Sequence, residues 1–403
     1  MDVTGARDVG DRCFWLQIAA LLERYAPQES LPGPLVAYGI LAAQDASRVV
    51  RLLTPRDRAA WLQRTVLPAA LLRRLAALST DELAVLAGRF RGHSRALAAL
   101  LGAVAPARRG ELYDRALAGA DTASLIPAAE IMEVLPATVR IREATRVLGL
   151  AKIQEREAQV LAWSAYLAWP DASVALEVAL RSGDAAERAS GYALLVEAAR
   201  RSRDPRSVAE VIVRLGRLRN EQDPVRAAAL TALAKVAPLL TAVTASGLTQ
   251  LTTDAVDARD SSVATTTALS RLAADVLQHH VAVPQLREWA LLTIDLVSSG
   301  AHVPVLRRFD TVLRRGQETM VFERLSGWIE AGIARGRYGP LFALTHAFGK
   351  RTRQLPELQD LLRRRSARTR CPRWPVRRSG CGLMTRGPAR TGSPRCLRPT
   401  RRR

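Results

Sequence analysis

A repeat of about 38 residues constrains the fold of this chain more than any other feature of its sequence. The segments "DAAERASGYALLVEAA", "DPVRAAALTALAKVA" and "DSSVATTTALSRLAADV" follow one another at this interval. Three sets of residues keep a spacing of 38: Glu187, Val225 and Val263; Gly191, Ala229 and Thr267; and Ala198, Val236 and Ala274. The turn aspartates, 39 and 37 residues apart, are Asp184, Asp223 and Asp260. A repeat of this length with two helices in each unit is typical of a stacked helical array.

The chain between residues 40 and 365 reads as a succession of helices. Segments such as "TDELAVLAGRF" and "PQLREWALLTIDLVSS" place apolar residues three and four positions apart, which is the spacing of one helix face. No alternating β pattern of comparable length occurs in the sequence. The expected helix starts are at Ser79, Asp171 and Pro224, and the expected breaks are at Pro136, Gly183, Pro238 and Gly300.

Stacking is the physical reason for such a repeat. A two-helix unit has more apolar surface than it can cover itself, and small residues such as Ala227, Ala228 and Ala229 let the next unit approach closely. We therefore expect an all-α fold, an α-solenoid of stacked helical hairpins over residues 40–365, with its best-defined repeats at 171–316. Residues 1–39 are expected to form an irregular or partial helical segment.

The segment "NEQDPVRAAALTALAKV", residues 220–236, resembles one unit of the HEAT-repeat family. Units of that family have an outer helix, a turn that bears aspartate, and an inner helix that opens with Val-Arg and continues with Ala and Leu. The matching residues are Asp223, Val225, Arg226, Ala229 and Leu233. The chain is also similar to uncharacterised HEAT-repeat proteins of high-GC actinobacteria, and this likeness supplies no catalytic residue.

The resemblance implies a structural ladder of hydrogen bonds between neighbouring units. Its members would be Asp184, Arg188, Asp223, Arg226 and Asp260. The neighbouring units depart from the family pattern, because Glu187 precedes Arg188 where valine is expected and Ala264 stands where the arginine should be. One rung of the ladder is therefore expected to be broken.

Residues 366–403 differ in composition from everything before them. They hold twelve arginines, no lysine and no acidic residue, with frequent Pro, Gly and Cys. Such a segment has almost nothing to bury, so we expect a disordered tail. It could be a basic arm that binds polyanions, a plain solvated tail, or the product of a frameshift. The use of 57 arginines against three lysines and one asparagine indicates a GC-rich gene and favours the frameshift. Translation of the gene in its other frames tests this, because the helical pattern should then continue past Arg365.

The formal net charge of +22 is concentrated in that tail. Without its twelve arginines, about +10 remains over the other 365 residues, a mild excess that attracts polyanions weakly. The sequence has no uninterrupted apolar run long enough to span a membrane, and its start, "MDVTGARDVGD", does not read as a cleavable signal. We therefore expect a cytoplasmic protein with no membrane segment.

No motif for catalysis or metal binding is present in the sequence. The histidines lack the spacing of a metal site, and the doublet His279-His280 is expected to end a helix. The cysteines do not form the close pairs of a zinc site; they are Cys13, Cys371, Cys381 and Cys396. Glu130 and Glu133, one helical turn apart, are expected to lie on a solvated face. We predict no enzymatic activity, no cofactor and no metal.

Two arginine clusters form the candidate binding patch. The first consists of Arg214, Arg217 and Arg219, near the end of one predicted helix. Arg214 and Arg217 are three residues apart and can share a helix face. The second, in "RRFDTVLRR", consists of Arg307, Arg308, Arg314 and Arg315 and suggests another basic helix. Such charges are also typical of ordinary solvated helix ends.

These features favour a non-enzymatic scaffold or adaptor that binds another protein through the extended surface of a helical-repeat array. The alternative is a nucleic-acid-binding module, because HEAT-like arrays serve some alkylpurine DNA glycosylases, which grip the duplex backbone with a basic face. That function would need convergent arginines with an aromatic residue and a carboxylate facing the base, whereas the basic clusters here are dispersed. A third interpretation, a lyase-type protein that handles a chromophore, rests on fold analogy alone.

Overall fold

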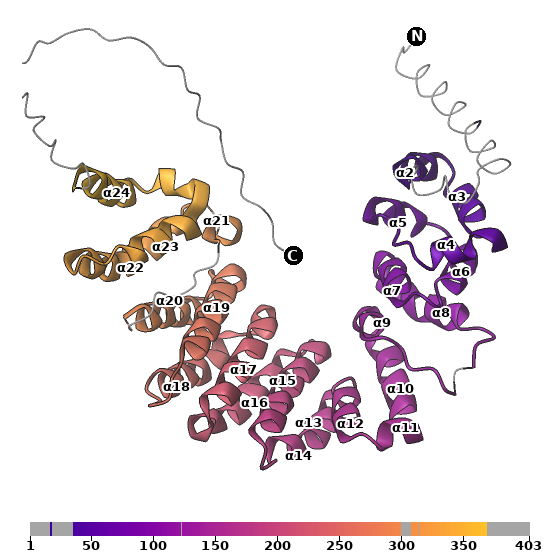
Figure 1. Ribbon diagram of the computed structural model, residues 1–403, viewed down its shortest axis with the longest axis horizontal. Coiled ribbons are helices and arrows are strands. Elements are labelled where there is room, and N and C mark those ends of the chain that lie inside the picture. The colour runs from indigo at the N-terminus through magenta and orange to yellow at the C-terminus, as the bar shows by residue number, and fades with distance from the viewer. Residues whose placement is uncertain (1–16, 18–34, 122, 300–307, 314, 369–403) are drawn as a thin grey trace, which may run out of the picture. The chain divides into compact units, whose positions relative to one another are not determined.

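A computed structural model of the protein describes residue 17 and residues 35–121, 123–299, 308–313 and 315–368 (Figure 1). Every regular element within these ranges is a helix, and no strand occurs among them, which confirms the predicted all-α class. Contacts divide the chain into two units, residues 1–354 and 355–403. None of the helices described in these ranges is both long enough and apolar enough to cross a bilayer.

The first part of the chain forms two rows of short helices. In chain order the elements are α2 (Leu35–Gln44), α3 (Ala46–Leu53), the 3-10 helix η2 (Arg56–Arg58), α4 (Ala59–Leu62), α5 (Ala69–Leu75), α6 (Thr80–Arg89), α7 (Ser94–Ala103), α8 (Pro106–Ala116) and α9 (Ala129–Val134). One row has α2, α5, α7 and α9 in successive contact, and the other has α3, α6 and α8. Their buried side chains belong to one apolar core, whose members extend in the sequence from Tyr38 to Tyr166.

Five short helices connect these rows to the repeats. They are α10 (Ala137–Leu148), α11 (Ala151–Gln154), α12 (Glu157–Ser164), α13 (Trp169–Ala175) and α14 (Glu177–Leu180). Helix α10 lies against α8, where the Arg142 guanidinium contacts the Asp114 carboxylate at 2.5 Å. Helices α12, α13 and α14 all contact the long helix that follows them.

The repeat region has a first layer of long helices and a second layer beside it. Its elements are α15 (Ala185–Ser202), α16 (Pro205–Leu215), η3 (Gly216–Asn220), α17 (Asp223–Leu233), η4 (Ala234–Leu239), η5 (Ala242–Thr244), α18 (Ala245–Val256), α19 (Val263–His280) and α20 (Pro284–Ser299). Helices α15, α17 and α19 contact one another in sequence and form the first layer, and α16, α18 and α20 do so in the second (Figure 1).

The same alternation continues toward the end of the first unit. The elements are α21 (Phe309–Val312), α22 (Gln317–Ala334), α23 (Gly339–Phe348) and η6 (Gly349–Gln354). Helix α20 contacts α22, and α21 contacts α23. Helix α24 (Pro356–Arg368) lies in the second unit and extends three residues past the predicted boundary at Arg365. The predicted tail beyond it, residues 369–403, lies outside the described residues, as does almost all of the predicted segment 1–39.

Burial gives the repeat spacing between successive first-layer helices. From α15 to α17 the buried Leu195 corresponds to the buried Leu233, a spacing of 38 as predicted. From α17 to α19 the buried counterpart of Leu233 is Leu272, because Arg271 is exposed, so the spacing is 39. The predicted equivalence of Val225 and Val263 is therefore wrong. Val225 is fully buried and Val263 is 50% exposed.

The three turn aspartates also occupy different positions. Asp184 is the N-cap of α15, Asp223 is the first residue of α17, and Asp260 lies two residues before Ser262, which is the N-cap of α19. Their near-equal spacing in the sequence therefore does not mark one repeated structural position. The turn before α19 is longer, and this length is the physical reason that the helix register shifts by one residue.

Close packing of neighbouring helices depends on two glycines. A Cβ atom on Gly191 of α15 would lie 2.8 Å from the Cβ of Ala179 in α14, and one on Gly247 of α18 would lie 2.5 Å from Cγ2 of Ile212 in α16. Carbon atoms do not approach so closely without strain. These glycines let neighbouring helices pack more closely than alanine would, in agreement with the predicted role of small residues.

Arginine side chains join helices of the first part of the chain through main-chain carbonyl groups. Arg108 of α8 donates to the carbonyl oxygens of Ala76 and Leu78, at 3.1 and 2.5 Å, and to the Thr80 hydroxyl. Arg91 donates to the carbonyl oxygens of Ala116 and Ala118, at 3.0 and 2.8 Å. The last carbonyl groups of a helix receive no hydrogen bond from an N–H group of the same helix. The arginine bonds therefore satisfy acceptors that would otherwise need water.

A third arginine of this kind follows the same rule. Arg109 donates to the carbonyl oxygens of Gly102, Val104 and Val134, at 3.0, 2.9 and 3.1 Å, and so connects the end of α7 with the end of α9. A guanidinium group has five N–H donors in a planar fork and can serve several carbonyls at once, which a lysine cannot do in the same geometry. We refer to the bonds of Arg91, Arg108 and Arg109 as the arginine–carbonyl bonds.

Most predicted helix boundaries agree with the structure, with two exceptions, at Asp171 and at Pro238. Ser79 caps α6 in a complete capping box with Glu82, and Pro224 lies in the first turn of α17, as predicted. Asp171 does not precede its helix but lies in the first turn of α13, which starts two residues earlier at Trp169. Pro238 lies inside η4 instead of ending a helix, and the predicted break at Gly300 is outside the described residues.

Candidate protein-binding surface

Three of the five predicted ladder residues, Asp223, Arg226 and Asp260, meet in the turns before α17 and α19. The Arg226 guanidinium, only 2% exposed, donates to Oδ1 of Asp260 at 3.1 Å and to the Glu221 carbonyl at 2.6 Å. The main-chain N–H of Asp223 donates to Oδ2 of Asp260 at 2.9 Å. In return, Oδ1 of Asp223 accepts hydrogen bonds from the Ser262 N–H and the Thr265 hydroxyl. These contacts join the turn of one repeat to the turn of the next.

The equivalent rung one repeat earlier uses an acid that the sequence analysis missed. Arg188 donates from Nε to both carboxylate oxygens of Glu221, at 3.1 and 3.0 Å, whereas Asp184 only accepts the N–H of Ala186 in its own helix. Each rung therefore joins an arginine to an acid 33 or 34 residues later, since the second rung is Arg226 with Asp260. Arg188 and Arg226 are 38 residues apart, which is the length of the repeat. The distance from Arg226 to Asp260 was therefore the signal that could have located Glu221 after Arg188.

The predicted break in the ladder occurs one residue later than expected. Because the register to α19 is 39, Thr265 and not Ala264 stands at the position of Arg226. Thr265 is fully buried and donates its hydroxyl back to Asp223 at 2.7 Å. The third unit thus has no arginine at this position and is joined to the second through the Asp223 carboxylate.

Two arginines of the first predicted cluster converge on one glutamate of a neighbouring helix. Arg217, in η3 after α16, donates to Oε1 of Glu177 in α14 at 2.9 Å, and Arg214 lies 3.6 Å from Oε2 of the same carboxylate. Arg214 also donates to the Ser173 carbonyl at 3.1 Å. A third guanidinium, that of Arg181, lies 3.1 Å from Glu177. We call Arg181, Arg214 and Arg217 with Glu177 the Glu177 cluster.

The charge balance of the Glu177 cluster favours ionised groups and leaves an excess of positive charge. Partial burial raises the pKa of the Glu177 carboxyl, but the hydrogen bond and charge of Arg217, together with those of Arg181, outweigh this effect and hold its pKa below the ordinary value. Three guanidinium groups thus share one carboxylate. The side chains of Arg181 and Arg217 remain 71% and 57% exposed.

A surface hollow of about 380 Å³ lies within this cluster. Its lining residues are Ser173, Val174, Glu177, Arg214 and Arg217. Beside it, the ring of Trp169 lies under the Arg214 guanidinium at 5.8 Å from the ring centroid, and its Nε1 donates to Glu210 at 2.8 Å. The hollow is therefore lined by two arginines, a carboxylate and one aliphatic side chain, with an aromatic ring packed against Arg214 next to it.

Three exposed valines lie on the helices around the Glu177 cluster, and one of them, Val174, lines the hollow. Val174 of α13 is 73% exposed, Val178 of α14 is 63% exposed and Val213 of α16 is 80% exposed. Single exposed aliphatic residues are common on protein surfaces, but several that gather beside a hollow are a usual sign of a binding site. We call Val174, Val178 and Val213 with the Glu177 cluster the valine–arginine surface.

The other predicted arginines do not join this surface. Arg219 lies two residues beyond Arg217 and its side chain is exposed, away from the Glu177 bonds. The prediction of a second basic helix is wrong, because α21 has only four residues, with Arg308 as its N-cap and Arg315 beyond its end. Arg308 is paired with Asp310 at 2.6 Å. Arg307 and Arg314 lie outside the described residues.

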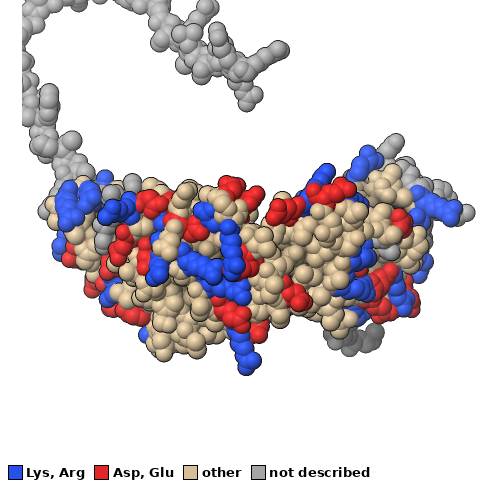
Figure 2. Space-filling model, turned by 90° about the horizontal axis from the view of Figure 1, so that it is seen from below, with Lys and Arg blue, Asp and Glu red and all other residues tan. Residues whose placement is uncertain are grey.

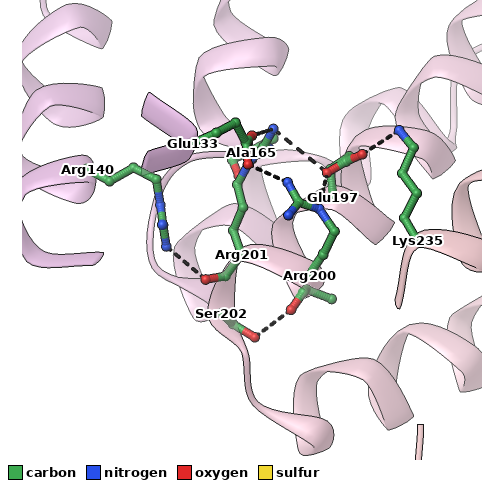
Figure 3. Close-up of polar contacts among 9 residues, drawn as sticks. Glu133, Arg140, Ala165, Glu197, Arg200, Arg201, Ser202 and Lys235 are labelled. Carbon is green, nitrogen blue, oxygen red and sulfur yellow. Dashed lines mark hydrogen bonds and ion pairs between the residues drawn. The ribbon is translucent and has the colours of Figure 1, made fainter. Parts of the chain in front are cut away.

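Glu133 is the clearest error of the sequence analysis at a polar site. Instead of lying on a solvated face, it accepts from Arg200 at 2.5 Å and from Arg201 at 2.7 Å, both at the end of α15 (Figure 3). Glu130 is exposed, as predicted. The partners of Glu133 are 67 and 68 residues away in the chain, so no local pattern could have indicated them.

Further bonds extend this group across four elements. Arg201 also donates to the Ala165 carbonyl at 3.1 Å, and its main-chain carbonyl accepts from Arg140 of α10 at 2.8 Å (Figure 3). Glu197 accepts from Lys235 of η4 at 2.6 Å. We call these residues with Glu133 and Arg200 the junction cluster, because they join α9 and α10 to the repeat helices.

Electrostatics of the junction cluster favour a structural role. Burial raises the pKa of the Glu133 carboxyl, but the hydrogen bonds and charges of Arg200 and Arg201 outweigh burial and hold the pKa below its ordinary value. The same competition, with Lys235 and Arg200 as partners, lowers the pKa of Glu197. Both carboxylates are therefore ionised at neutral pH and fully engaged by cations of neighbouring helices.

The described residues contain no group of three or more His, Cys, Asp and Glu side chains placed to hold a metal ion. His280 ends α19 as predicted, and its Nε2 lies 2.7 Å from the Ala237 carbonyl oxygen. Cys13 and the three later cysteines lie outside the described ranges. Comparison with family models, with curated proteins and with solved structures found no match for this chain.

Proposed function

We propose that this protein is a non-enzymatic scaffold or adaptor, an α-solenoid of HEAT-like helical hairpins that binds another protein in the cytoplasm. The observation that carries this proposal is the valine–arginine surface, where exposed valines on neighbouring helices accompany a hollow lined by Val174, Arg214 and Arg217. Repeated helical hairpins offer such surfaces on a rigid framework. The two-layer alternation of helices and the recurring Arg–acid rungs support the solenoid assignment.

The nucleic-acid alternative has less support. Basic and acidic side chains intermix over the face shown in Figure 2, with uncharged areas between them. The described arginines of the predicted clusters are largely paired with acids, Arg217 with Glu177 and Arg308 with Asp310. A duplex-binding face would instead present several arginines that converge on phosphate groups.

A photo-crosslinking experiment tests the proposed function. A benzophenone amino acid replaces Val213, or Val174, in the full chain expressed in its native cells, and Val85 of α6, which is 54% exposed, serves as the matched control position. We expect a discrete covalent protein adduct from Val213 and Val174 but not from Val85. Equal labelling at all three positions, or none at any, would contradict a specific protein-binding surface here.

Duplex binding separates the alternative. The full chain and a chain that ends at Arg365 are titrated with duplex DNA at about 0.15 M salt and at higher salt. The scaffold proposal expects that any affinity of the full chain is lost with residues 366–403. Binding by the shorter chain, with a steep dependence on salt, would favour the nucleic-acid function instead.

A further inference from the structure

We propose that the occupant of the valine–arginine surface is an acidic peptide segment of a partner protein, with an aliphatic side chain seated in the hollow and carboxylates held by Arg181 and Arg217. This inference rests on the proposed function and specifies the chemistry of the partner. It is carried by three observations: the charge excess at Glu177, the order of residues along the two helix rows, and the uncharged side chains next to the hollow.

The charge excess calls for carboxylate groups from a partner. Glu177 is the carboxylate shared by Arg181, Arg214 and Arg217, with separations of 3.1, 3.6 and 2.9 Å. A guanidinium group has five N–H donors, and Arg217 donates one of them to Glu177. Because the Arg181 and Arg217 side chains are more than half exposed, their other donors can reach a second carboxylate from outside. Arginine clusters are a recurring means of binding acidic peptide motifs.

The exposed residues of the surface follow the same order along both helices. Ser173 is joined to Arg214, and Glu177 is joined to Arg217, so the α13–α14 row and α16 run side by side in the same direction. Val174 and Val178 precede Arg181 in one row, and Val213 precedes Arg217 in the other. Both rows therefore lead from exposed valine to exposed arginine over one to two helical turns.

This order of valine and arginine predicts the spacing of aliphatic and acidic residues in the bound peptide. The valines precede the arginines by three, four and seven residues, which corresponds to roughly 4–11 Å along a helix. An extended peptide covers this distance in about one to three residues. The expected segment therefore carries a Val, Ile or Leu side chain, followed or preceded at this interval by Asp or Glu residues. The hollow of about 380 Å³ has ample room for one such aliphatic side chain.

The uncharged side of the surface argues against a phosphate backbone as the occupant. Val174, Val178 and Val213 offer aliphatic contact and no hydrogen-bond donors. The Trp169 ring is already engaged by Arg214 and Glu210, whereas single-stranded nucleic acids bind to aromatic rings that are open for stacking.

Peptide display on the intact protein tests this inference. A library of random 16-residue peptides is selected on the full chain, and single peptides are then measured by fluorescence anisotropy. We expect recovered peptides to be enriched in Asp and Glu next to Val, Ile or Leu. Their affinity for the double variant Arg181→Glu/Arg217→Glu should fall by about tenfold or more, because two attractive contacts become repulsive. Higher salt should weaken the same peptides.

Two further variants keep the test informative. Arg181→Gln/Arg217→Gln removes the charges without placing new carboxylates beside Glu177, and it should reduce affinity less than the reversal does. Arg115→Glu on α8 is the control, because Arg115 is an exposed arginine paired with Glu111 in the same i,i+4 manner as Arg181 with Glu177, and also with Asp81 of α6. It should leave peptide affinity within about twofold.

The outcomes separate this inference from the proposed function. Neutral or basic peptides, peptides that bind the charge-reversed variant equally well, or no recovered peptide would overturn the acidic occupant. Displacement of the acidic peptides by duplex DNA would also overturn it and would assign the surface to nucleic acid. If crosslinked protein adducts still form at Val213 in those cases, the scaffold function stands and only the chemistry of the partner is wrong.

Discussion

The first rows of helices and the later repeats join their neighbours in different ways. Among α5 to α9, arginines such as Arg108 and Arg109 donate to main-chain carbonyls at helix ends. In the repeats, Arg188 and Arg226 are joined to the acids Glu221 and Asp260. A carbonyl acceptor is present whatever its side chain and does not titrate. An acid is a stronger partner for a buried guanidinium, but its strength depends on its protonation.

The largest expected effect is the loss of a buried arginine from the repeats. Arg226→Ala should lower the free energy of unfolding by about 3 kcal/mol, because the guanidinium is buried and its removal leaves Oδ1 of Asp260 and the Glu221 carbonyl without the donors that Arg226 supplies. Urea unfolding followed by circular dichroism measures this change. Asp260→Asn should cost less, because the Asp260 side chain is about half exposed. Equal costs for the two variants would place the stabilisation outside the pair.

The arginine–carbonyl bonds should matter somewhat less. Arg108→Ala should cost about 2 kcal/mol, since three acceptors lose a donor but remain partly accessible to water. Arg108→Lys should recover little of this, because one ammonium group cannot reach acceptors spaced for a planar fork. The control is Arg115→Ala on the same helix, whose exposed side chain pairs with Glu111 and with Asp81 of α6, at under about 1 kcal/mol. Full rescue by lysine would show that only charge matters at Arg108.

A comparison of two glycines tests close packing in the repeats. Gly191→Ala should destabilise by about 1 kcal/mol, because strain against Ala179 exceeds the gain in helix propensity. Gly88→Ala in α6 meets no atom within 4 Å and should stabilise by roughly 0.5–1 kcal/mol. Thermal melting of both variants measures the difference. If both substitutions stabilise the protein, helices α14 and α15 are not held at the close distance described.

The smallest expected effect is the response to pH, and it separates the two kinds of bond. The pKa of Asp260 is lowered, because the Asp223 N–H and Arg226 outweigh its desolvation. A lowered carboxyl pKa contributes stability above the ordinary value near 3.8, and this contribution is lost as the pH falls through the lowered pKa. The cost of Arg226→Ala should therefore be equal at pH 7 and pH 5 and shrink near pH 3.

The matching control for pH is the Arg108→Ala variant. Its acceptors are carbonyl and hydroxyl groups that do not titrate in this range, so its cost should stay constant from pH 7 to pH 3. Unfolding in urea at each pH gives both series. A parallel decrease in the two costs would mean that acid weakens the whole array, and the distinction between the two regions would not hold.

Part of the architecture was predictable from periodicity. The spacing of 38 between Gly191 and Ala229 follows the buried face of two helices in direct contact. The next interval could not be obtained in the same way. Val263 aligns with Val225 in the sequence, but the longer turn shifts the buried position to Thr265. Apolar periodicity identifies a helix face but is tolerant of one extra residue in a turn.

The candidate surface was predictable only in its arginines. Arg214 and Arg217 do share one face, as their spacing indicates, but their common partner Glu177 lies 40 residues earlier on α14. Glu133 and the acceptors of Arg108 were not predictable at all. The first depends on contact with a helix more than 60 residues away, and the second involves main-chain atoms that every residue possesses.

The arginine–carbonyl bonds have a consequence for how such a chain can evolve. Apart from the Thr80 hydroxyl, the segments that receive Arg91, Arg108 and Arg109 supply backbone oxygen, so substitutions that preserve the packing of residues 76–78, 102–104 and 116–118 leave the acceptors in place. Mutational drift is then limited by the donor and by loop length instead of by the identity of the loop residues. Helices joined by such bonds can keep their arrangement while the residue pairs that would indicate the contact in the sequence change.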